Sequence, residues 1–101
     1  MSVKDSEDEP AATRVPCDHV VFTDLDGREG VLVDLNTKKY YQLNETASLI
    51  WRGLEQRFPL RQIAMEMTEH YDVTLERATS SIETALRHFE AQKLLASADR
   101  G

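Results

Sequence analysis

The sequence has few of the residues on which disulfide-linked, metal-binding and membrane-spanning proteins depend. It contains one cysteine, Cys17, so no internal disulfide can form. No run approaches the roughly 18 apolar residues that a membrane-spanning helix requires. Residues 1–14 also lack the apolar segment of a signal peptide. We therefore expect a cytoplasmic protein without a membrane partner, whose fold is held together by packing.

Patterns that would indicate catalysis or metal binding are also scarce. The histidines, His19, His70 and His88, include no pair at ligand spacing, and Cys17 beside His19 is too little for a metal site. The four glycines are scattered and form no phosphate-binding loop. No base or oxyanion site is apparent that would make Cys17 a nucleophile. We expect no metal, no cofactor and no independent enzymatic activity.

Length and charge limit the organisation and the partners of the chain. At 101 residues it has room for one compact domain, and its net charge of -6 repels phosphate backbones and anionic lipids. Residues 1–16 begin with an acidic cluster and continue with Pro10 and small residues, which is typical of a disordered tail. The domain is therefore expected over residues 17–97.

The segment "HVVFTDLDGREGVLVDLNTKKYYQL", which begins at His19, predicts three β-strands. Asp26-Gly27 favours a tight turn, and a second turn is expected at residues 36–38. Short connections of this kind produce an antiparallel meander. From the period-two pattern we expect four residues to face the core: Val33, Leu35, Tyr41 and Leu43. Their neighbours are then expected on the opposite face: Leu32, Asp34, Tyr40 and Gln42.

After Leu43 the apolar period changes to that of helices. Asn44 is a suitable N-cap for a first helix, Pro59 can begin a second, and Thr74 can cap a third of about five turns. The fold class is therefore α+β and winged-helix-like, with an N-terminal three-stranded antiparallel sheet followed by three helices. The expected apolar stripes are Ala47, Ile50, Trp51 and Leu54 in the first helix, Leu60, Ile63, Ala64 and Met67 in the second, and Ala78, Ile82, Ala85, Leu86 and Phe89 in the third.

The short loop between the last two helices also suggests a helix-turn-helix, and so a DNA-binding transcriptional regulator. The recognition helix would span residues 75–95. It carries three basic residues, Arg77, Arg87 and Lys93, against three acidic ones, Glu76, Glu83 and Glu90. A helix that enters the major groove normally presents a net basic face. We therefore expect no nucleic-acid partner, and DNA binding stands as the alternative function.

The third predicted strand lies at the edge of the meander, where its unpaired backbone groups can accept a strand from a peptide. Lys38 and Lys39 lie where that peptide would run. Edge lysines also protect a sheet against aggregation, and two such strands could instead pair in a structural dimer. Lysines beside an outward tyrosine would equally attract an acidic, partly apolar peptide.

One stretch resembles a known family. "VLVDLNTKKYYQLNETASLIW", a short helix ending near Tyr71 and a long helix ending in "FEAQKLL" are similar to the PqqD-like family. Its members include the peptide chaperone of pyrroloquinoline quinone biosynthesis and the recognition elements of ribosomally made, post-translationally modified peptides. The resemblance implies a non-catalytic protein that binds the leader of a precursor peptide as an extra strand. It places that peptide in the cleft between the third strand and the third helix.

Carried onto this chain, the resemblance and the edge argument predict ten peptide-binding residues: Lys38, Lys39, Tyr40, Tyr41, Gln42, Leu43, Ile82, Leu86, Arg87 and Phe89. A pocket is expected near Tyr40 and the three apolar residues of the third helix. Plain core packing is the alternative role of those three residues. Lys38 occupies a position that is often glycine in such sequences, so we expect either a positive φ or a different turn there.

The resemblance also implies a second protein partner. The precursor would be presented to a separate modifying enzyme such as a leader protease, a cyclase or a radical SAM enzyme. The free-standing form and the tyrosine pair are most similar to the stand-alone recognition proteins of lasso-peptide clusters, which work with a separate leader protease.

Overall fold

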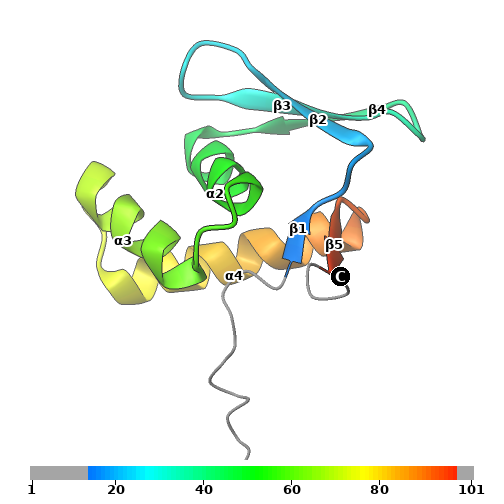
Figure 1. The fold of residues 1–101 in the computed structure, drawn as a ribbon. Coiled ribbons are helices and arrows are strands. Elements are labelled where there is room, and N and C mark those ends of the chain that lie inside the picture. The colour runs from blue at the N-terminus through cyan, green and yellow to red at the C-terminus, as the bar shows by residue number, and fades with distance from the viewer. Residues whose placement is uncertain (1–13, 98–101) are drawn as a thin grey trace, which may run out of the picture.

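A computed structural model describes residues 14–97 of the chain (Figure 1). The strands and helices follow the predicted order, with one additional short strand at each end. In chain order they are β1 (Arg14–Pro16), β2 (Val20–Asp24), β3 (Gly30–Asp34), β4 (Lys39–Leu43), α2 (Glu45–Glu55), α3 (Leu60–His70), α4 (Leu75–Ala91) and β5 (Leu95–Ser97). The expected α+β fold, a three-stranded antiparallel sheet followed by three helices, is confirmed.

The main sheet is an antiparallel meander with the strand order β2-β3-β4. The three helices lie on one side of this sheet, with α2 directly beneath it and α3 and α4 further away (Figure 1). Among the described residues β4 pairs only with β3, so its other edge is open, as predicted. The chain passes from Leu43 through Asn44 directly into α2, which ties the open strand to the helical layer.

The faces of β3 are the reverse of those expected. Leu32 is fully buried and Asp34 is only 3% exposed, whereas Val33 is half-buried and Leu35 is 49% exposed. The prediction was wrong because valine or leucine occupies both faces of this strand, so a period of two does not select the inner one. On β4 the prediction of the inner face is confirmed for Leu43, which is buried, and Tyr41 is half-buried on the same face.

Asp34 is buried because it organises the turn between β3 and β4. Its Oδ1 accepts hydrogen bonds from the backbone N–H groups of Asn36 (2.9 Å) and Thr37 (3.2 Å). The N–H of Lys38 donates to the Asp34 carbonyl at 2.7 Å, and Lys38 has a φ of 66°. The positive φ considered for Lys38 is therefore present. A lysine accepts this conformation because the aspartate satisfies the turn's backbone donors.

Helices α2 and α4 begin at the predicted caps, and α3 begins at Leu60, one residue after the predicted Pro59. Asn44 Oδ1 accepts from the N–H of Ala47 at 2.8 Å, and Thr74 Oγ1 accepts from the N–H of Arg77 at 3.1 Å. Trp51 is fully buried at the centre of the core, where its ring meets that of Phe89 edge to face, with centroids 5.0 Å apart. This contact joins α2 to α4 beneath the sheet.

The two short terminal strands were not predicted. β1 pairs antiparallel with β5, with Val15 opposite Ala96, and Arg14 forms an ion pair with Glu90 of α4. Three residues of the expected tail are therefore in a strand, and residues 1–13, which make up the rest of it, lie outside the described part. In residues 14–97 no helix is both long enough and apolar enough to cross a bilayer.

Candidate functional site

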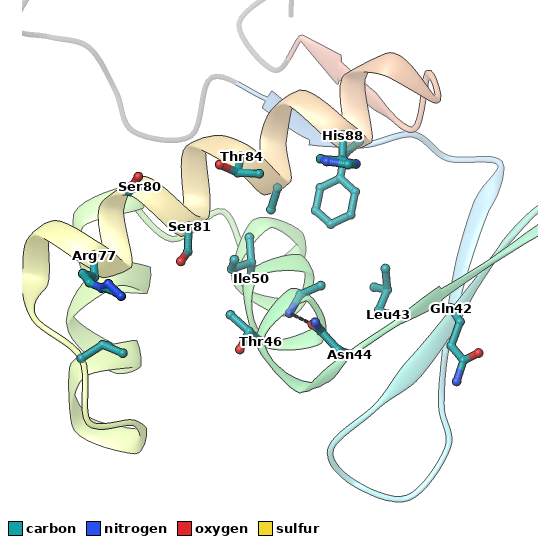
Figure 2. Close-up of a pocket in the computed structure, with 14 residues that line it drawn as sticks. Gln42, Leu43, Asn44, Thr46, Ile50, Arg77, Ser80, Ser81, Thr84 and His88 are labelled. Carbon is teal, nitrogen blue, oxygen red and sulfur yellow. Dashed lines mark hydrogen bonds between the residues drawn. The ribbon is translucent and has the colours of Figure 1, made fainter.

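A cleft of about 810 Å³ opens where β4 ends, α2 begins and α4 passes by. Figure 2 shows its lining, with the side chains of α4 facing those of α2 and the end of β4 across the cleft. The lining residues are Gln42, Leu43, Asn44, Thr46, Ala47, Ile50, Val73, Arg77, Ser80, Ser81, Thr84, Ala85, His88 and Phe89. The cleft therefore lies at the end of the open strand.

The floor of the cleft is apolar because it is the border of the core. Leu43, Ile50 and Phe89 line the cleft and are also buried core residues. Ala47 and Ala85, which are half-buried, leave space above them because their side chains are small. An apolar side chain of a ligand could rest here and lose its contact with water, which is the main source of binding energy for such groups.

The wall formed by α4 is polar and carries no carboxylate. Arg77, Ser81, Thr84 and His88 recur at intervals of four, three and four residues, which places them on one face of the helix. None of the lining residues is Asp or Glu, although the chain has 18 of them. Arg77 is exposed and, within residues 14–97, forms no ion pair. The cleft is thus less negative than the rest of the molecule.

Only part of the predicted site lies at this cleft. Gln42, Leu43 and Phe89 line it. Ile82 and Leu86 are buried core residues that do not line it, which agrees with the plain packing considered for them. Arg87 is exposed on α4 but does not line the cleft either.

Tyr40 does not face the apolar residues of α4 with which a pocket was expected. Tyr40 is 73% exposed and alternates with Tyr41, so its ring leaves the sheet on the face opposite the helices and cannot meet Phe89. Tyr41 points towards the helices and packs against the core. Lys38 and Lys39 are exposed at the turn that leads into β4. These four residues lie in β4 or directly before it, and none of them lines the cleft.

Sequence reasoning missed the polar wall of the cleft. The lining residues that were not predicted to bind peptide include Thr46, Val73, Arg77, Thr84 and His88. The sequence does contain a signal for this wall, because the polar stripe of α4 runs immediately beside its apolar stripe. This signal is not specific to a binding cleft, because polar residues beside an apolar stripe are normal on any surface helix.

The described residues hold no cluster of three or more histidine, cysteine, aspartate or glutamate side chains suited to a metal ion. Asp34 is the buried carboxylate at the start of the β3–β4 turn. Its pKa lies below the usual value of 3.8: burial acts to raise it, but the hydrogen bonds from the Thr37 and Asn36 backbone and the nearby His19 ring together outweigh that effect. A carboxylate of this kind supports a turn and has no proton to exchange near neutral pH.

Comparison with solved structures gives two close matches in fold. "TbiB1 in Complex with the TbiA(beta) Leader Peptide" is 28% identical with a TM-score of 0.74, and the match covers 80% of this chain and 93% of that one. "Lasso peptide synthetase B1 complexed with the leader peptide" is 24% identical with a TM-score of 0.76, covering 84% and 99%. At that identity the second match shows the fold alone. A search of curated proteins gives no significant match.

A family model settles the classification. The model for coenzyme PQQ synthesis protein D, PqqD, matches residues 29–95, which include β4, the three helices and every residue that lines the cleft. The match covers well over half of the chain. The chain therefore belongs to the PqqD family.

Proposed function

We propose that this protein is a non-catalytic recognition element that binds the leader of a ribosomal precursor peptide by strand addition to β4. The observation that carries the proposal is the open edge of β4, which continues into a cleft beside α4. Membership of the PqqD family and the likeness in fold to TbiB1, solved with a leader peptide, support it.

In this mechanism the backbone supplies most of the affinity. The outward N–H and C=O groups of residues 39–43 have no partner strand among the described residues and would pair with those of the peptide. Such bonds tolerate many sequences, because they do not involve side chains. Selectivity therefore has to come from the cleft.

The cleft would select the side chains that the bound strand directs towards the helices. An apolar side chain would rest on the floor formed by Leu43, Ile50 and Phe89, and an acidic one would meet Arg77. Lys38 and Lys39, exposed at the start of β4, would speed and orient the approach of an acidic leader. We infer that the bound precursor is then presented to a separate enzyme, such as a leader protease, a cyclase or a radical SAM enzyme.

Strand addition is tested with backbone-modified peptides. A leader peptide that this protein binds is synthesised with single N-methyl groups, and the affinity of each peptide is measured by fluorescence anisotropy. Methylation at positions that pair with β4 should weaken binding by about tenfold each, because it removes a hydrogen bond and adds a clash. Methylation at alternate positions, where the N–H points away from β4, is the matched control. Uniform tolerance along the peptide would contradict strand addition.

The charge component is tested at the turn. Lys38→Glu combined with Lys39→Glu should weaken leader binding about three- to tenfold, chiefly through a slower association rate. Because both side chains are exposed, the melting temperature should stay near that of the parent protein. Stopped-flow association with the same peptide measures the rate. An unchanged association rate would mean that the two lysines do not contribute to peptide capture. It would not contradict the proposal of strand addition.

A further inference from the structure

The side of the main sheet that faces away from the helices is bare in the described part of the protein (Figure 1). The strand register places Val21, Val33 and Tyr40 in one row across β2, β3 and β4. Val31 belongs to the same face, and Leu35, whose N–H donates to the His19 carbonyl at 2.8 Å, continues it. We call these residues the outer face: Val21, Val31, Val33, Leu35 and Tyr40.

The outer face is apolar and has no charge in a chain that is 30% charged. The two remaining outward positions within β2, β3 and β4, Thr23 and Gln42, are also uncharged. Val21 is 43% exposed, Leu35 49% and Tyr40 73%. Exposed antiparallel sheets usually carry charged or polar side chains on the solvent side, so an uncharged apolar face is a candidate docking surface.

The area of this face argues against a stable homodimer. Three strands about 4.8 Å apart and five residues long, at about 3.4 Å per residue, cover roughly 250 Å². A stable interface needs about 800 Å² from each partner. Each copy also carries a net charge of -6, which opposes self-association. The face therefore suits a partner that makes additional contacts elsewhere.

The peptide site supplies those contacts, because the outer face is continuous with it. The row Val21–Val33–Tyr40 ends at the open edge of β4. A peptide paired with β4 would extend this row by one residue, and its outward side chains would lie beside Tyr40. The loaded protein then presents one continuous four-stranded surface.

We propose that the outer face, completed by the outward side chains of the bound peptide, is the docking surface for the enzyme that acts on that peptide. This proposal rests on the proposed function. The partner's contact patch is apolar and uncharged at its centre, because a charge there would be buried against valine and tyrosine without a partner. The enzyme would thereby distinguish the loaded protein from the empty one.

The test places a charge on the face without altering the peptide site. Val21→Lys and Val33→Lys are compared with the control Thr79→Lys, which adds the same charge at an exposed position of α4 outside the cleft. Melting temperatures verify folding, and Val21→Thr, which keeps the β-branched shape, serves if a lysine variant unfolds. Leader affinity is measured first by anisotropy. The affinity of each peptide-loaded variant for the purified enzyme that acts on that peptide is then measured.

We expect leader affinity within about twofold of the parent for all variants, because the edge and the cleft are untouched. Enzyme affinity should fall by about tenfold or more for the two lysine variants, by about threefold for Val21→Thr, and by less than about twofold for Thr79→Lys. Unchanged enzyme affinity with normal leader binding would overturn this inference and leave the proposed function standing. Failure of the parent to bind leader would instead reject the proposed function. A dimer of the free parent protein in sedimentation, which becomes a monomer in Val33→Lys, would also overturn the inference. The outer face would then be the contact between two copies of this chain.

Discussion

At the scale of single residues, the structure separates positions that look equivalent in the sequence. Arg77 and Arg87 both lie on α4 and are both exposed, but only Arg77 lines the cleft. Tyr40 and Tyr41 are adjacent, yet one faces away from the helices and the other packs on the core. The sequence shows that such a pair must divide between two faces. It does not show where on a helix surface the cleft will open, because that depends on how α4 crosses α2.

Arg77 provides a direct test of the cleft. Arg77→Glu should weaken binding of an acidic leader by about tenfold, because it replaces an attraction with a repulsion between partly exposed groups. Arg61→Glu, the same reversal at an exposed position of α3, should have little effect. Isothermal titration with the leader peptide measures both. Equal losses for the two variants would mean that the effect reports net charge and not contact in the cleft.

Asp34 predicts a dependence of stability on pH. Its pKa in the folded protein lies below the unfolded value of 3.8, so its contribution to stability is complete above about pH 5 and is lost as the pH falls through the folded pKa. Asp34→Asn should lower the free energy of unfolding at pH 7 and flatten its decline between about pH 5 and pH 3. Urea titrations across this range test the sign. A mutant whose stability declines with acid as steeply as that of the parent would contradict this role.

At the scale of strands and helices, local signals predict most of the fold. The turn residues, the caps Asn44 and Thr74, and the apolar periods define β2 to β4 and all three helices. The pairing of β1 with β5 could not be predicted, because each strand has three residues and its partner lies at the other end of the described chain. The inner face of β3 was assigned wrongly because both of its faces are apolar. Sequence periods locate elements well, but they do not report contacts between distant short segments.

The contact between α2 and α3 depends on a glycine. A Cβ at Gly53 would lie 2.7 Å from Ile63 Cδ1, which is too close for real atoms. Gly53→Ala gains about 1 kcal/mol of helix propensity but overpacks this contact, which typically costs 1–3 kcal/mol. We therefore expect a net loss of about 1 kcal/mol in the free energy of unfolding.

A second substitution, at Ile63, provides the control for this prediction. Combining Gly53→Ala with Ile63→Ala should show a favourable coupling energy in a double-mutant cycle, because the second change creates the space that the first one needs. Chemical denaturation of the four proteins measures this coupling. Additive effects would mean that the helices already adjust without strain.

At the scale of the whole molecule, the protein has a closed side and an open side. The helices, the T-shaped contact of Trp51 with Phe89 and the β1–β5 pair close one side. The edge of β4, the cleft and the outer face of the sheet remain open and adjacent to one another. An acidic molecule with a cleft free of carboxylates and an uncharged sheet face is suited to bringing a peptide and a second protein together. No catalytic group is required for this task.

Amide hydrogen exchange shows whether β4 accepts a strand from a bound peptide. The full chain is measured by NMR with and without the leader peptide. We expect amides in residues 39–43 whose N–H groups point away from β3 to exchange quickly in the free protein and at least about tenfold more slowly with peptide bound. Amides of β2 that point away from β3 serve as the internal control and should not change. Tight peptide binding without any slowing in β4 would contradict the account.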